Sequence, residues 1–433
     1  MSRRKSLRLL AVVAMVTTVL VSATVASAGT YPQPCNGVTF DPANPSHVFY
    51  GSGSANGTTV NRSAAPGPQI FFWNGEGSAT LTGSAFDDII CGTTGDDTIS
   101  GGKGNDLIFG EGGYDSLYGN GGDDTIFNGG FAGGAAPNGP GAEPNGDSAY
   151  VYGRKGNDLI YTGWSSDGAY GGAGDDVINA KDFGYGYDAD LYGQTGDDTM
   201  IAGEGDYTRL YGRAGNDILT LGSGWFQDAF GGPGTDTLTG GTGVDQELDG
   251  QGGNDTLTAG TGTPQYLYGG GGNDILSNLG AAASQYAYGE TGNDTITAKT
   301  SGAGFYAFGG KGNDVIKGGA AGDELYGHSG NDVIWGGDGG DYINGGSGSD
   351  VMYGNTPGPG GLDTADGDLD DMLASSSPLI PGVFGAPDTP ATSNTFYGAC
   401  LDAGDTADAT GTGVDTAYNT SSNSGIENVV NGC

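Results

Sequence analysis

The chain has 433 residues, of which 92 are glycine and only 15% are charged. Its 52 acidic residues outnumber its 14 basic ones and give a net charge of −38, which argues against nucleic acid as a partner. The glycines follow no strict period of three, which excludes collagen. Such a composition favours disorder without counterions, but apolar residues that recur in strict register favour an ordered fold once cations bind.

The chain begins with a pattern typical of a secretory signal, residues 1–28. A basic stretch, Arg3 to Arg8, precedes an apolar run from Leu9 to about Val25, and Ala26-Ser27-Ala28 offers small residues for cleavage. No second long apolar run follows, so we expect no transmembrane segment. The sequence therefore predicts a secreted, extracellular protein.

Residues 29–82 form a lead-in rich in proline, glycine and asparagine, with one apolar run at Ile70–Trp73. Residues 354–433 form a tail without repeats, in which 405–408, 414–417 and 426–430 resemble strand fragments. The terminal coils of a repeat array need covers, and both flanks have a suitable size. We therefore predict an N-terminal and a C-terminal cap around the repeats at 83–353.

The repeats open with one nine-residue phrase written five times between Gly83 and Phe127: GSAFDDIIC, GTTGDDTIS, GGKGNDLIF, GEGGYDSLY and GNGGDDTIF. The phrase fits G-G-x-G-x-D-x-U-x, where U is a large apolar residue. Its glycines permit positive φ and close backbone approach, so the first six residues can form a tight loop. The aspartate at position six supplies a hard oxygen ligand of the kind that calcium prefers. The x-U-x tail predicts a short strand with U facing inward.

This phrase strongly resembles the RTX nonapeptide of haemolysin-type secreted proteins. The resemblance covers the repeats alone and implies an all-β fold, a right-handed parallel β-roll or β-solenoid. In that family successive strands fall on opposite sheets, two repeats complete one coil, and multiple calcium ions lie between stacked loops. Calcium is thus the expected cofactor.

Eighteen aspartates occupy position six, and we predict that they are calcium ligands. Capping of turns through local hydrogen bonds is the alternative, but eighteen carboxylates in register would repel one another without a cation. They are Asp88, Asp97, Asp106, Asp115, Asp124, Asp158, Asp176, Asp198, Asp217, Asp236, Asp255, Asp274, Asp294, Asp314, Asp323, Asp332, Asp341 and Asp350.

We call the loops that fit the nonapeptide strong loops, and their spacing changes along the array. Both outer blocks step by nine residues, whereas from Gly193 to Gly309 the step is 19 or 20. The middle therefore alternates a strong nonapeptide with a degenerate unit of ten or eleven residues. If residues 128–152 make one half-coil with an insertion, the strong middle loops all fall on one edge of the roll.

The opposite edge would then keep good loops only near its ends. In its central units Tyr207, Phe226 and Pro264 stand where we expect the aspartate. Asp167 and Asp245 are exceptions, for which the sequence predicts weak sites.

The inward U residues predict a thin apolar stack, so we expect calcium to supply much of the folding free energy. They are Ile90, Ile99, Ile108, Leu117, Ile126, Ile160, Ile178, Met200, Leu219, Leu238, Leu257, Leu276, Ile296, Ile316 and Ile334.

Two outward columns leave alternatives open. Aromatic residues end most weak half-coils and predict either a structural ladder or a surface for carbohydrate or another partner. Threonines on the opposite face, such as Thr237 and Thr239, indicate either ordinary strand filling or ice binding. The 19-residue alternation is similar to that of a calcium-dependent RTX antifreeze region of a large bacterial adhesin, but positions that carry threonine there are Lys155, Ala173 and Ala214 here.

Four cysteines, Cys35, Cys91, Cys400 and Cys433, predict disulfides in an exported chain. Three pairings are possible, and we favour Cys35–Cys91 with Cys400–Cys433 because each pair would tie one end of the array. A zinc site fits poorly, since the spacings are wrong and the only histidines are His47 and His328.

The chain contains no H-E-x-x-H and no G-x-S-x-G motif, and its flanks of 54 and 80 residues are too small for the usual catalytic domain. We therefore predict that it is not an enzyme. The sequence favours a secreted calcium-binding protein with a structural, adhesive or matrix role. It leaves open whether the partner is a glycan, a cell-surface component or a matrix component. A calcium-dependent ice-binding protein is the alternative function.

Overall fold

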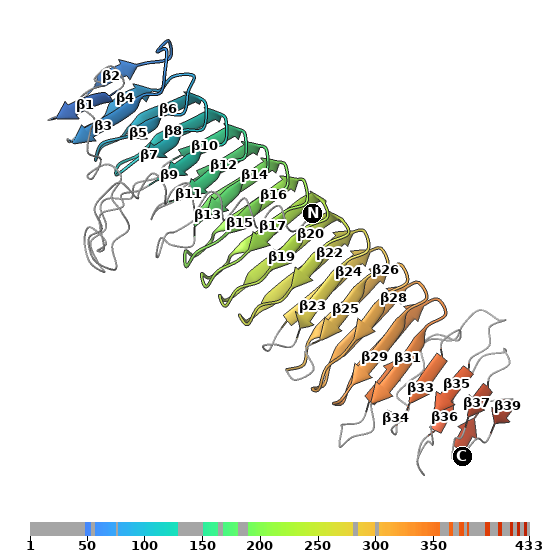
Figure 1. Cartoon of the computed structure of the whole chain (residues 1–433). Coiled ribbons are helices and arrows are strands. Elements are labelled where there is room, and N and C mark those ends of the chain that lie inside the picture. Colours follow the sequence, from blue (N-terminus) through green and yellow to red (C-terminus); the bar gives the residue numbers. More distant parts are fainter. Residues whose placement is uncertain are drawn as a thin grey trace, which may run out of the picture. The chain divides into compact units, whose positions relative to one another are not determined.

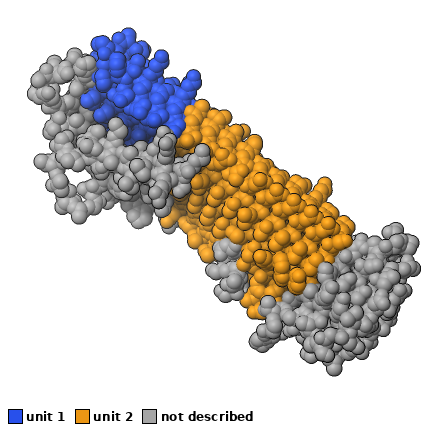
Figure 2. Space-filling view, turned by 45° about the vertical axis from the view of Figure 1, so that its right-hand side comes forward, with its two compact units in different colours: residues 1–170 blue, residues 171–433 orange. Residues whose placement is uncertain are grey.

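A computed structural model of the chain describes residues 57–74, 77–128, 150–162, 168–180, 189–279, 285–298 and 303–355, together with strands at 48–52 and between 363 and 430. The predicted signal at 1–28 lies outside the described residues. The chain divides into two compact units, residues 1–170 and 171–433 (Figure 2). Regular structure in the described ranges is all β, and none of it is a helix long and apolar enough to cross a membrane.

Each unit is a parallel β-solenoid built from two sheets (Figure 1). The chain alternates between the sheets, so odd-numbered strands pair with odd-numbered ones and even-numbered with even-numbered ones. We call them the odd sheet and the even sheet. The predicted all-β parallel architecture is therefore confirmed within each unit.

In the first unit the odd sheet contains β1 (Val48–Ser52), β3 (Ile70–Asn74), β5 (Ile89–Cys91), β7 (Leu107–Phe109), β9 (Thr125–Phe127) and β11 (Leu159–Tyr161). The even sheet contains β2 (Thr58–Asn61), β4 (Ala79–Thr82), β6 (Thr98–Lys103), β8 (Ser116–Gly121) and β10 (Tyr150–Lys155). β12 (Gly168–Ala173) contains residues of both units.

In the second unit the odd sheet contains β13 (Val177–Asn179), β15 (Thr199–Ile201), β17 (Ile218–Thr220), β19 (Thr237–Thr239), β21 (Thr256–Thr258), β23 (Ile275–Leu279), β25 (Thr295–Ala298), β27 (Val315–Lys317), β29 (Val333–Gly337), β31 (Val351–Asn355), β33 (Met372–Ser375), β35 (Thr395–Gly398), β37 (Thr416–Tyr418) and β39 (Asn428–Val430). The even sheet contains β14 (Asp190–Thr195), β16 (Arg209–Ala214), β18 (Asp228–Gly234), β20 (Gln246–Gly253), β22 (Gln265–Gly271), β24 (Gln285–Thr291), β26 (Tyr306–Lys311), β28 (Glu324–Ser329), β30 (Tyr342–Ser347), β32 (Asp363–Asp366) and β34 (Leu379–Ile380). β36 (Thr406–Asp408) and β38 (Ser422–Ser424) pair separately.

The core is one column of apolar side chains per sheet, as the period of two within a strand predicts. Leu219, Leu238 and Leu257 stack in exact parallel register through successive odd strands. All fifteen predicted inward residues have no exposed surface. Most strands give the core a single large apolar side chain, so the apolar column is narrow and the turns must supply further stability.

Strand pairings on either side of residues 129–149, which lie outside the described residues, agree with one half-coil at 128–152. β10 pairs with β8, which sets Val151 opposite Leu117, and β11 pairs with β9, which sets Ile160 opposite Ile126. The register of the coils therefore continues across it.

The flanks form strands where the sequence predicts them. The apolar run of the lead-in is β3, which pairs with β1 and β5. In the tail, β36, β37 and β39 overlap the three predicted strand fragments. Cys91 is fully buried beside Phe109, whereas the other three cysteines lie outside the described residues.

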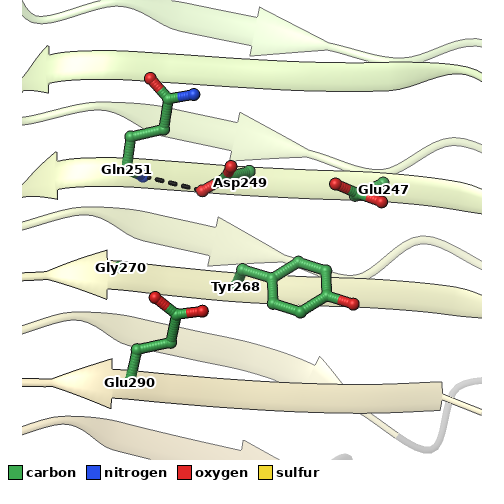
Figure 3. Close-up of a pocket in the computed structure, with 6 residues that line it drawn as sticks. All are labelled: Glu247, Asp249, Gln251, Tyr268, Gly270 and Glu290. Carbon is green, nitrogen blue, oxygen red and sulfur yellow. Dashed lines mark hydrogen bonds between the residues drawn. The ribbon is translucent and has the colours of Figure 1, made fainter.

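Aromatic rings form a stacked column on the outer face of the even sheet. Within the second unit, the ring centroids of Tyr268 and Tyr288 are 4.9 Å apart, and those of Tyr288 and Phe308 are 4.8 Å apart. Asp249 interrupts this column beside Tyr268, and its carboxylate accepts a hydrogen bond of 3.0 Å from the backbone N–H of Gln251 (Figure 3). The predicted structural ladder is present, with one polar rung.

Candidate metal-binding edges

The chain turns from the even sheet to the odd sheet along one edge of each unit, the first edge, and returns along the second edge. Tight glycine loops make the first-edge turns. Gly215, for example, has a φ of 148°, and a Cβ there would overlap the carbonyl oxygen of Gly196 in the preceding loop. A side chain is therefore excluded where adjacent loops stack, which explains why the repeats conserve this spacing of glycines.

One aspartate ends each first-edge loop, directly before an odd strand. Its backbone N–H donates a hydrogen bond of 2.7–2.8 Å to Oδ1 of the aspartate one coil further on, as between Asp236 and Asp255. The first unit has Asp88, Asp106, Asp124 and Asp158 on this edge, and the second unit has Asp176, Asp198, Asp217, Asp236, Asp255, Asp274, Asp294, Asp314, Asp332 and Asp350. Within each unit the structure thus brings together the strong loops that the register assigns to one edge.

The second carboxylate oxygen of these side chains faces the loop interior. All eighteen predicted aspartates are at most 2% exposed. In the described part of the chain, Oδ2 of nine of them is buried and has no hydrogen-bond partner, namely in Asp106, Asp124, Asp198, Asp236, Asp255, Asp274, Asp294, Asp314 and Asp332.

A buried carboxylate without a partner is unfavourable, and the surroundings make it more so. Burial, with a smaller contribution from neighbouring aspartates, raises the pKa of Asp106 and Asp124 to about 8. It likewise raises the pKa of Asp198 and Asp294 to about 7. A row of such carboxylates attracts cations strongly.

The donor set fits calcium. Each turn offers a carboxylate oxygen, and the stacked loops add backbone carbonyl oxygens, which together suit a hard cation. No group of three or more His, Cys, Asp or Glu side chains converges on one point among the described residues, so backbone oxygens would have to complete the coordination. The role of the eighteen aspartates as calcium ligands remains a prediction that this placement supports.

The second edge has the same arrangement only where aspartates occupy it. In the first unit the backbone N–H of Asp97 donates to Oδ1 of Asp115 at 2.9 Å. In the second unit Asp323 donates in the same way to Asp341, also at 2.9 Å. These are the four second-edge aspartates that the sequence predicts.

In the middle of the second edge, the aspartate position predicted from the sequence lies one residue too early. The backbone N–H of Glu247, in the next coil, donates to the carbonyl oxygen of Gln227. On the first edge, the N–H of Ile218 donates in the same way to the carbonyl oxygen of Asp198. Gln227 therefore occupies the aspartate position, and Phe226 precedes it. We call the aspartate position, directly before each strand, the slot. The weak turn contains one additional residue, so counting forward from its glycine gives the wrong residue for the slot.

The same correction applies to the other weak turns. Thr208 and Gln265 occupy the slot, and Tyr207 and Pro264 precede it. Gln246 fills the slot that the sequence assigned to Asp245, and Asp245 precedes it. Asp167 lies outside the described residues.

The buried glutamines form a ladder of their own. Nε2 of Gln227 donates to the carbonyl oxygens of Gly203 and Gly205 at 3.0 and 2.7 Å, and its Oε1 accepts from the N–H of Gly222 at 2.7 Å. Gln265 continues the ladder, since its Nε2 donates to Oε1 of Gln246 at 3.0 Å.

A neutral amide therefore satisfies loop carbonyl oxygens that would otherwise attract a cation. This part of the second edge needs no metal ion. Counting backward from each strand, instead of forward from each glycine, would have revealed the glutamines at 227, 246, 265 and 285.

Comparison with known families agrees with this geometry. The model of the RTX calcium-binding nonapeptide repeat family matches residues 73–133, 145–178, 183–224, 230–264, 266–278 and 306–356, more than half of the chain. None of the curated proteins compared with the chain matches it.

The raised carboxyl pKa values predict that acid partly replaces calcium. Folding lifts the pKa of these aspartates from 3.8 to about 7 or 8, so the folded state binds protons more tightly than the unfolded state. Their contribution to stability is therefore complete below a pH of about 4 and is lost as the pH rises through about 7 to 8. Circular dichroism in calcium-free buffer should show more β-structure near the lower pH. A loss of β-structure on acidification would contradict the assignment.

The two ladders predict different effects of mutation. Asp255→Asn should reduce the number of bound calcium ions by at least one, because it removes a first-edge carboxylate. Gln246→Leu should leave that number unchanged but lower the unfolding temperature, since each buried group left unpaired costs about 1–3 kcal/mol. Calcium titration and thermal unfolding measure the two effects. A change in ion number in Gln246→Leu, with none in Asp255→Asn, would reverse the assignment of the edges.

Proposed function

Because the chain belongs to the family of proteins with RTX calcium-binding nonapeptide repeats, we propose that it is secreted, folds on extracellular calcium and serves a structural, adhesive or matrix role. The observation that carries this proposal is the set of nine buried first-edge carboxylate oxygens, named above, that have no hydrogen-bond partner in the described part of the chain. A row of this kind favours the folded state only when cations neutralise it.

The proposed mechanism couples folding to location. At cytosolic calcium concentrations the acidic turns repel one another, and the narrow apolar column is too weak to hold the coils together. At the calcium concentrations of extracellular modules, about 10⁻⁴–10⁻³ M, ion binding supplies the missing free energy. The chain would thus stay open for export and fold outside.

Export is supported by the signal-like pattern of residues 1–28. The pairings Cys35–Cys91 and Cys400–Cys433 remain part of the proposal. So does the absence of catalytic activity, which the lack of hydrolase motifs in the sequence supports.

Calcium-triggered folding is the direct test of this function. Circular dichroism should change from a disordered spectrum in chelator to a β-rich one in about 5–10 mM calcium. The same concentration of magnesium is the control and should have little effect, because Mg²⁺ demands a smaller octahedral site. Identical spectra with and without calcium would refute the proposal.

Ice binding remains the alternative function, favoured by one observation. Thr220, Thr239, Thr258 and Ser277 stand opposite one another through four successive odd strands of the second unit. This hydroxyl column lies on a parallel sheet. Calcium-loaded protein should then show thermal hysteresis, which Thr239→Tyr should reduce. Ice crystals that grow unchanged in its presence would eliminate this alternative.

A further inference from the structure

Large side chains stand exposed on the second edge of the second unit, where the glutamine ladder replaces aspartate. Trp225 is 57% exposed and Tyr207 is 50% exposed. The ring of Tyr207 stacks on that of Phe226 with centroids 5.1 Å apart. The corresponding first-edge residues, which precede the slot, are polar, as at Asp197 and Asn216. The edge that needs no metal therefore differs from the calcium edge in its surface as well as in its interior.

A hollow of about 480 Å³ opens beside these rings, and we call it the aromatic hollow. Its lining is mostly aromatic and acidic. The residues that line it are Tyr207, Phe226, Tyr266, Asp228, Asp245, Glu247 and Arg209. Glu247 projects from the outer face of β20, in the same row as Asp249 (Figure 3).

The aromatic hollow has more negative than positive charge. Its one cation, Arg209, forms an ion pair with Asp190 at 2.8 Å. Burial, together with the nearby charge of Glu247, raises the pKa of Asp228 to about 6. Burial and the charge of Asp249 raise the pKa of Glu247 in the same way. A further positive charge would relieve this repulsion.

The side chains around the aromatic hollow do not form a metal site by themselves. In the described part of the chain, no set of three His, Cys, Asp or Glu side chains is placed to hold one. The aromatic walls instead suit an organic cation, which can lie against a ring and pair with a carboxylate. The second unit shows the first of these contacts within itself, because the guanidinium of Arg213 lies 5.4 Å from the centre of the Tyr192 ring.

We propose that the aromatic hollow binds an arginine side chain from a basic segment of a partner protein. The guanidinium would stack against Phe226 or Tyr266 and pair with Asp228 or Glu247. Arginine fits better than lysine, because its planar group combines stacking with two parallel hydrogen bonds to a carboxylate. The adhesive role proposed above would then rest on charge and aromatic contact at the edge that calcium does not occupy.

The test uses the full chain in calcium at about 150 mM salt, after circular dichroism has shown that it is folded. The probe is a short end-blocked peptide of glycines and arginines, titrated by calorimetry. We expect saturable binding that Phe226→Ala and Asp228→Asn each weaken by at least about fivefold. A peptide with glutamine in place of arginine should not bind.

Tyr306→Ala and Glu324→Gln are the matched controls, since both residues lie on the even sheet of the same unit but outside the aromatic hollow. They should weaken binding less than about twofold. Equal weakening by Glu324→Gln and Asp228→Asn would mean diffuse attraction to an acidic chain and would overturn the proposal. So would the absence of binding by folded protein. Failure to fold in calcium would instead count against the proposed function.

Discussion

The structure depends on the repulsion among buried carboxylates and on its relief by cations. Along the first edge of each unit, an aspartate from every coil directs one oxygen into the loop stack and uses the other to accept the backbone N–H of the preceding coil. The hydrogen bonds fix the register of the coils, but at nine of the described first-edge aspartates they leave the other carboxylate oxygen buried without a partner. In the proposed function the narrow apolar column cannot offset these buried carboxylates alone, so coil stacking and calcium binding form one process.

The second edge of the second unit solves the same structural problem in another way. At Gln246 an amide takes the place of a carboxylate and its cation, because its nitrogen donates to loop carbonyl oxygens while its oxygen accepts a backbone N–H. A neutral residue stacks without repulsion, so consecutive glutamines are tolerated without an ion. The outer surface of this edge has the exposed side chains of Tyr207 and Trp225.

Most of the fold follows from the sequence because each repeat places the same types of residue at the same positions. Residues such as Leu219 recur with the strand period and are buried as predicted. Asp124 and Asp158 align in adjacent coils, as the half-coil predicted at 128–152 requires. The slot at Gln227 was misassigned because position was counted from the glycines. An additional residue in the weak turn shifts that count, while the strand behind it keeps its register. The aromatic hollow was not predictable, since it depends on which side chains of adjacent turns come together.

Diffraction from crystals of the calcium-bound protein, with anomalous signal used to locate the ions, tests the central claim most directly. The account predicts calcium between successive first-edge loops of the second unit, such as those that end at Asp236, Asp255 and Asp274. It predicts none beside Gln227, Gln246 and Gln265 on the second edge. Ions in equal number along both edges, or none between the first-edge loops, would contradict it.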